Sequence, residues 1–192
     1  MLTLADVLPI PTFVAQRRKL EAEVVAAKTM RRLAAGPQMT WLFENRATCL
    51  WQVQEMCRVE NITAPAAVQH ELDTYNALLP SPSDLSATLL IEIDDPAERA
   101  VQLRALLGLH EHVRLTFAGA PDALARFDGA QFDGERVSSV QFVRFPLSSS
   151  QIEALRDLGR PATLAITHPA YPVSTPLPLT LRAALVEDLA SA

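Results

Sequence analysis

The segment RVSSVQFVRF, residues 136–145, is a strand pattern that decides the fold class. It is rich in Val and Phe, and β-branched and aromatic residues are enriched in strands. Apolar residues occupy positions of both parities, with Val137, Val143 and Phe145 on one and Val140 and Phe142 on the other. This pattern predicts a strand that is buried on both faces of a sheet.

Strand and helix patterns alternate on either side of this segment. Further strands are predicted at 86–93, 113–119 and 162–168, and helices at 96–109, 148–159 and 179–191. The order is β-α-β-β-α-β followed by a helix, which is the ferredoxin-like order. We therefore expect one four-stranded antiparallel sheet with 86–93 and 136–145 at its centre.

The first 80 residues predict helices. Residues 12–35 are rich in helix formers, and Gly36-Pro37 is typical of a helix end. Thr40 can cap a second helix that runs to Glu60, and Pro65 suits the first turn of a third helix over 65–79. The fold class is therefore α+β, with a helical region 1–80 packed on a ferredoxin-like region 85–192 in one compact unit.

Composition narrows the class of protein. The chain has 192 residues, of which 49% are hydrophobic and 20% charged, so it can bury a sizeable core. Its net charge of −5 argues against nucleic acid or an anionic membrane as the main partner. No apolar run approaches the roughly 20 residues that span a bilayer, and the N-terminal segment MLTLADVLPIPTF lacks the basic start and long apolar core of a signal peptide. We expect a cytoplasmic protein in which Cys49 and Cys57 are buried thiols.

The segment LFENRATCLWQVQEMCRVE, residues 42–60, predicts a charged site. On a helical wheel Glu44, Glu55 and Arg58 share one stripe, which two tryptophans flank. The helix over 65–79 supplies further polar groups. Together they predict a polar cluster with these candidate ligand-binding residues: Glu44, Arg46, Glu55, Arg58, Glu60, Glu71 and Asn76.

Three interpretations of this cluster remain open. In the first, the cluster is a buried salt-bridge network that fixes helix packing, because buried charges need partners. Alternatively it is a divalent metal site, formed by Glu44, Glu55, His70 and Asp73. The Glu-x-x-His pairs of di-iron bundles are absent, which counts against that second interpretation. In the third, Arg46 and Arg58 bind an anion and Glu55 or His70 acts as acid or base.

Several blocks resemble a bacterial family that is known as a domain of unknown function. They are LFENRATCLWQVQEMCRVE, QHELDTYNALLP, SATLLIEI, RVSSVQFVRFP and HPAY. Members of that family are often encoded beside rubrerythrin-like and iron–sulfur oxidoreductase proteins. The resemblance implies a cytoplasmic accessory or interaction protein linked to redox or peroxide metabolism, with such proteins as partners. The alternative is an enzyme, or a metal- or anion-binding protein, that uses the polar cluster.

Overall fold

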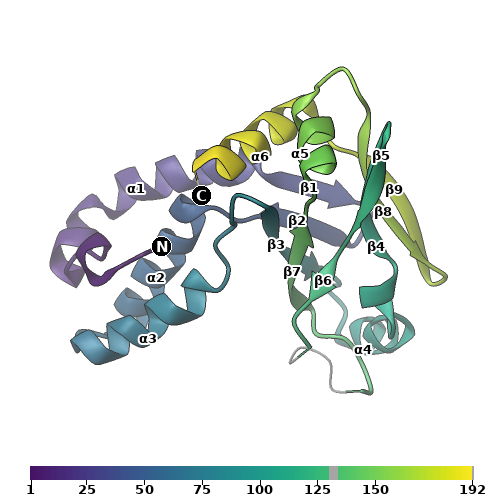
Figure 1. The fold of residues 1–192 in the computed structure, drawn as a ribbon. Coiled ribbons are helices and arrows are strands. Elements are labelled where there is room, and N and C mark those ends of the chain that lie inside the picture. Colours follow the sequence, from purple (N-terminus) through teal and green to yellow (C-terminus); the bar gives the residue numbers. More distant parts are fainter. Residues whose placement is uncertain (130–133, 192) are drawn as a thin grey trace. The chain divides into compact units, whose positions relative to one another are not determined.

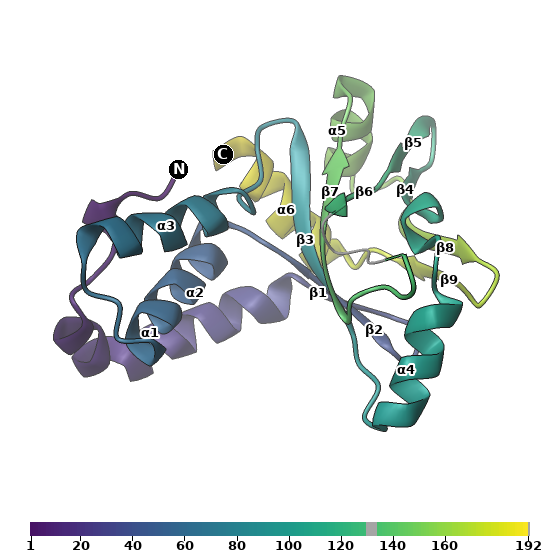
Figure 2. The same ribbon diagram turned by 90° about the horizontal axis from the view of Figure 1, so that it is seen from below.

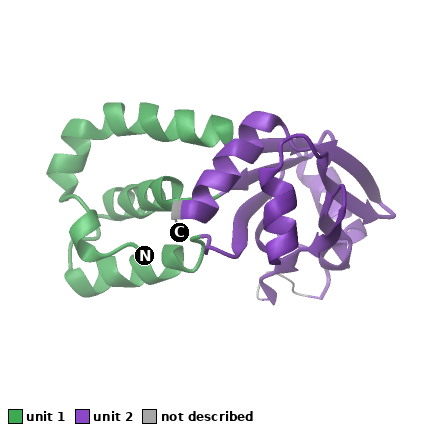
Figure 3. Cartoon of the chain, turned by 45° about the horizontal axis from the view of Figure 1, so that its top comes forward, with its two compact units in different colours: residues 1–30, 44–79 green, residues 31–43, 80–192 purple. Residues whose placement is uncertain are grey.

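The computed structural model describes residues 1–129 and 134–191, which form two compact units (Figure 3). The first unit contains Met1–Met30 and Glu44–Leu79. The second contains Arg31–Phe43 and the chain from Pro80 onward. The chain thus passes from the first unit to the second and back before it completes the second.

The first unit is helical. It contains the short 3-10 helix η1 (Leu4–Asp6) and the helices α1 (Ile10–Met30), α2 (Arg46–Val59) and α3 (Pro65–Asn76). In both views α2 lies between α1 and α3 (Figure 1, Figure 2). A small apolar core holds the unit together and contains Leu2, Cys49, Val53, Cys57, Val68 and Leu72. Both cysteines are buried, as predicted.

The predicted continuous helix over 40–60 is wrong at its start. Asn45 is the N-cap of α2: its side chain accepts a hydrogen bond from the Thr48 amide, and the Thr48 hydroxyl accepts one from the Asn45 amide. These reciprocal bonds satisfy two donors at the helix start. Residues Met39–Phe43 therefore lie outside the helix and form a strand.

The second unit contains a five-stranded and a four-stranded antiparallel sheet (Figure 1). The first has the order β1 (Arg32–Ala35), β2 (Met39–Phe43), β3 (Asp84–Ile91), β7 (Val140–Pro146), β6 (Arg126–Phe127). The second has the order β5 (Ala120–Leu124), β4 (Val113–Phe117), β8 (Ala162–His168), β9 (Tyr171–Pro176). The α+β class is confirmed.

The structure has two sheets in place of the predicted single ferredoxin-like sheet. Strands β3 and β7 are antiparallel neighbours inside their sheet, as predicted, but β4 and β8 pair with each other in a separate sheet. The reason is additional strands that the prediction lacked. The hairpin β1–β2 extends one sheet beside β3, and β9 forms a hairpin with β8 in the other.

The hairpin β1–β2 was predicted as helix. Gly36 has a φ of +72° and lies in the turn between the two strands, so Gly36-Pro37 is a hairpin turn and not a helix end. Tertiary burial decides this segment: Trp41 and Phe43 are fully buried and pack on Phe145 of β7, with ring centroids 5.9 and 6.2 Å apart.

Helices α4 (Pro96–Ala105), α5 (Ser149–Arg156) and α6 (Leu179–Ser191) and the short η2 (Leu109–Glu111) complete this unit. Both sheets, together with α5 and α6, contribute to one hydrophobic core. The prediction that 136–145 is buried on both faces is wrong. Gln141, Val143 and Phe145 are buried, but Val140 is 39% exposed. Among the described residues, no helix is long and apolar enough to cross a membrane.

Candidate functional site

The predicted polar cluster is divided between separate places on the helical unit. Glu55 of α2 accepts hydrogen bonds from Arg17 of α1 and Arg58 of α2, each at 2.8 Å. Arg17 also pairs with Glu21 and lies 5.5 Å from the centre of the Trp51 ring. The pKa of Glu55 is held below its ordinary value, first by the hydrogen bond from Arg58 and next by that from Arg17, against the opposing effect of burial. Glu55 is therefore ionised at neutral pH and joins α1 to α2.

Glu44 does not lie beside Glu55. It precedes α2, is buried, and accepts a hydrogen bond of 2.5 Å from the Thr48 hydroxyl. The stretch of helix from Arg46 to Glu55 is roughly 14 Å long at 1.5 Å per residue. A helical wheel shows the direction of side chains and hides this axial distance, so the expected carboxylate pair does not form.

The charges of several acidic groups instead act on the phenol of Tyr75 on α3. Burial raises its pKa, and the charges of Glu71, Glu44 and Glu60 raise it further. Glu71 also raises the pKa of the Cys57 thiol, after the larger effect of burial. This environment keeps both the phenol and the thiol protonated at neutral pH.

The four predicted metal ligands do not converge. His70 and Asp73 are exposed on α3, and Asp73 accepts a hydrogen bond from Gln69. In the part of the chain that the structure describes, no three His, Cys, Asp or Glu residues are arranged to hold a metal ion. Glu60 is exposed as well and lies at the C-cap of α2.

Two predicted cluster residues, Arg46 and Asn76, bind the chain's own N-terminal segment, residues 1–8, which we name the arm. The Asn76 side chain accepts a hydrogen bond from the Leu2 amide at 2.7 Å and donates one to the Leu2 carbonyl at 2.9 Å. Gln54 of α2 makes the same pair of bonds with Leu8, at 2.7 and 3.2 Å. The arm is thus held by its peptide groups, as an extended peptide is held in a binding groove.

Arg46 provides the third clamp on the arm. Its guanidinium donates a hydrogen bond to the Met1 carbonyl at 2.7 Å and pairs with the Asp6 carboxylate at 2.5 Å. Hydrogen bonds from Thr3 and Arg46 lower the pKa of Asp6, those from Thr3 having the larger effect. Gln54 and Arg17 take part in these contacts but are not among the cluster residues predicted from the sequence. The sequence signal for Gln54 is an amide beside the apolar Val53, and the structure buries this amide to 4% exposure.

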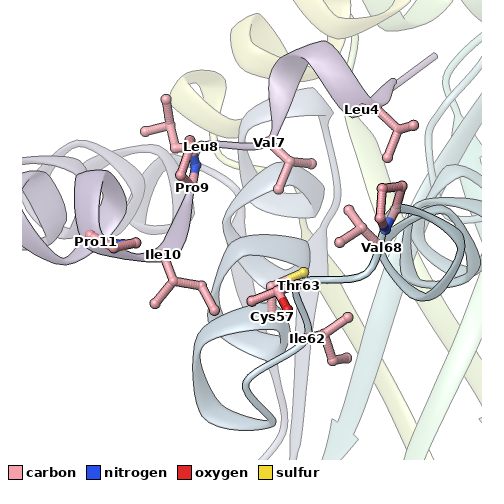
Figure 4. A pocket seen from close by; sticks show the side chains of 11 residues that line it. Leu4, Val7, Leu8, Pro9, Ile10, Pro11, Cys57, Ile62, Thr63 and Val68 are labelled. Atoms are coloured by element: carbon pink, nitrogen blue, oxygen red, sulfur yellow. The ribbon is translucent and has the colours of Figure 1, made fainter.

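An apolar cavity of about 380 Å³ lies between the arm and the α2–α3 pair (Figure 4). In Figure 4, Val7 and Cys57 lie between Ile10 on one side and Val68 on the other. One wall comes from the arm and the start of α1, and the other from α2, α3 and their connection. The lining is Leu4, Val7, Leu8, Pro9, Ile10, Pro11, Cys57, Ile62, Thr63, Pro65 and Val68, and it contains no charged side chain.

A second cavity, of about 240 Å³, lies between α1 and α2. Phe13 and Trp51 line it, in edge-to-face contact with centroids 5.5 Å apart, and Asp6 and Glu23 also lie on its wall. Leu8 lines both cavities, so the arm separates them.

Buried charges in the sheet unit stabilise its fold. Arg31 pairs with Asp188 of α6 through two hydrogen bonds of 2.7 and 2.9 Å. Arg182 of α6 donates to the carbonyls of Ala154 and Leu155 at the end of α5, and burial lowers its pKa. Because these charges are bound to partners within the fold of the sheet unit, the helical unit offers the better candidate site.

Comparisons with known proteins agree with this fold. A family model described as "Protein of unknown function (DUF3501)" matches residues 1–189. The crystal structure of a protein of unknown function from Burkholderia pseudomallei K96243 is similar, with a TM-score of 0.91 and 31% sequence identity. That match covers 97% of this chain and 98% of the other. No curated protein matches the sequence.

Proposed function

The chain belongs to the DUF3501 family of unknown function, and from this premise we propose that it is an interaction protein that docks an apolar segment of a partner protein. The docking site is the cavity between the arm and the α2–α3 pair. The observation that carries the proposal is the uncharged, largely aliphatic lining of this cavity. Its volume of about 380 Å³ lies within the range of ligand-binding pockets.

The chemistry of the lining favours a protein segment over a small polar ligand. Small-molecule sites contain a few placed polar groups that orient the ligand. Here the side chains of Thr63 and Cys57 are the polar ones in an otherwise aliphatic and proline-rich wall. Leucine-like side chains of a partner need no such groups, because apolar burial alone drives their docking.

The charged residues support a binding role over catalysis. Arg46 and Arg58 are each ion-paired, with Asp6 and Glu55. Glu55, held ionised between two guanidinium groups, is a poor proton donor at neutral pH. A role as acid–base catalyst or anion receptor would require these pairs to break.

The partners that we propose are rubrerythrin-like or iron–sulfur oxidoreductase proteins, and the role is that of a cytoplasmic accessory protein in redox or peroxide metabolism. This part of the proposal rests on the resemblance of the sequence blocks given above, which implies such gene neighbours. The cavity adds a requirement, namely that the partner offers exposed apolar side chains.

Calorimetric titration of the purified chain with each partner protein from the same organism tests the proposal. Thr63→Trp places an indole at the cavity mouth from an exposed position, and we expect it to weaken binding about tenfold or more. Thr74→Trp is the matched control, because Thr74 is exposed on α3 and outside the cavity lining. Equal affinities for the wild type and Thr63→Trp, or no binding by the wild type, would contradict the proposal.

A further inference from the structure

The arm has the properties of a separate ligand that is bound to its own chain. Its clamps, Arg46, Gln54 and Asn76, lie on α2 and α3, between 40 and 74 residues away in sequence. Leu2 is 1% exposed and belongs to the apolar core that α2 and α3 form. The arm therefore docks on helices that are distant from it in the chain.

The arm is also structurally self-contained. The Asp6 carboxylate accepts hydrogen bonds from the amide and the hydroxyl of Thr3, at 2.8 and 2.9 Å. The Asp6 amide in turn donates to the Thr3 carbonyl at 3.0 Å. These bonds close η1 within the arm, so it can leave and dock as one piece.

The connection to α1 is a short hinge. Leu8 carries the last clamp, and α1 begins at Ile10. Only Pro9 lies between them, and proline has no amide hydrogen to lose and a fixed φ. A change of backbone direction at residues 8–9 would separate the arm from its groove and leave α1 intact.

We propose that the arm exchanges between two copies of this chain, so that each arm docks on α2 and α3 of the other copy. The exchange requires no new complementarity, because every clamp and the Leu2 site are reused unchanged. Exchange of an identical element is a low-cost route to a dimer. In such a dimer each cavity is lined by two chains: Leu4, Val7 and Leu8 come from one copy, and the α2–α3 wall comes from the other.

A charge exchange between Asp6 and Arg46 tests the proposal. In Asp6→Arg the arm and the groove of one chain are both basic, and in Arg46→Asp they are both acidic, so neither variant can close its own pair. When the two variants are mixed, arm exchange restores both pairs across the dimer. Native mass spectrometry distinguishes the heterodimer, because the variants differ in mass. We expect its population to exceed that of either homodimer by about tenfold.

The double variant Asp6→Arg/Arg46→Asp is the control. It restores the pair within one chain and loses the Thr3 cap, so it separates the effect of the cap from that of the ion pair. It should dimerise no more than the wild type.

A second measurement uses the wild-type chain, in case a variant fails to fold. Isotope-labelled and unlabelled wild-type protein, mixed at high concentration, should form mixed dimers. Asn76→Ala should speed their appearance without changing their final amount, because the arm must leave its groove before it exchanges and the clamp is the same in monomer and dimer; Arg18→Ala, at an exposed α1 position, should change neither. Monomer masses at every concentration in both measurements overturn the exchange.

The exchange reuses the helical unit of the proposed function, yet the two can fail independently. If the exchange is overturned while Thr63→Trp still weakens partner binding, the docking function stands. If heterodimers form but the wild type binds neither partner protein, the docking function fails and the exchange stands.

Discussion

Gly36 illustrates how one residue fixes the hairpin that the sequence patterns concealed. Its φ of +72° is a conformation that residues with a side chain rarely adopt. A Cβ atom there would lie 2.5 Å from the Tyr171 hydroxyl oxygen. That hydroxyl donates to the Ala35 carbonyl and accepts from the Gln38 amide, and so joins β9 to the β1–β2 turn.

Gly36→Ala should therefore destabilise the protein by roughly 1–3 kcal/mol, because backbone strain and the contact with Tyr171 add. Gly108→Ala is the matched control. Gly108 has a φ of +88° and open space around it, so only the strain of about 1 kcal/mol applies. Urea unfolding measures both. In a Tyr171→Phe background the cost of Gly36→Ala should fall toward that of the control, and an unchanged cost would disprove the contact.

At the scale of elements, ion pairs between helices replace the expected reactive cluster. Arg17 of α1 and Arg58 of α2 both bind Glu55, and Arg17 also covers the Trp51 ring. Of the three interpretations of the polar cluster, this geometry agrees best with a salt-bridge network that fixes helix packing. It explains why a helix with several buried sides carries so many charges.

Glu55→Gln should lower the free energy of unfolding by about 1–3 kcal/mol at pH 7. The pKa of Glu55 is lower in the folded than in the unfolded protein. Its ionised form thus stabilises the fold above the unfolded-state pKa of about 4.3, and this contribution is lost as the pH falls through the folded-state value. Urea unfolding between pH 7 and pH 3 should show the wild type and the variant converging.

Glu23→Gln provides the control for that series. The Glu23 side chain is 61% exposed and lies 3.8 Å from Lys19, so the change should stay within about 0.5 kcal/mol at every pH. A constant difference between wild type and Glu55→Gln over the whole range would show that the carboxylate charge is not what stabilises the fold.

At the scale of the whole molecule, the arm controls access to the core of the helical unit. Cys57 lines the larger cavity described above, Cys49 lies in the apolar core of the same unit, and both are about 1% exposed. Burial and the charge of Glu71 raise the pKa of Cys57, which further slows any reaction that needs the thiolate.

Thiol labelling with a disulfide reagent should thus proceed at least about a hundredfold more slowly in native than in urea-unfolded protein. Asn76→Ala releases the Leu2 clamp and should speed the labelling of Cys57, whereas Arg18→Ala should not. Rapid labelling of both cysteines in the native wild type would contradict this account of the arm.

The sequence by itself determined the elements whose signals are local. The strand over 162–168, the helix that begins with Pro65 and the helix capped by Ser148 occur where the sequence predicts them. Caps, proline positions and residue periodicity act within a few residues, so they can be recognised without the fold. The burial of Cys49 and Cys57, which the sequence also predicts, is confirmed.

Only the tertiary structure decided the sheets and the site. Residues 32–43 contain good helix formers, yet they form the hairpin β1–β2, whose second strand pairs with β3, because burying Trp41 and Phe43 outweighs weak local preference. Glu44 and Glu55 point in the same direction on a helical wheel. They lie apart along the axis, however, because Glu44 precedes α2. The clamps on the arm join residues up to 74 positions apart. Such contacts depend on distances in three dimensions, which no pattern along the chain specifies.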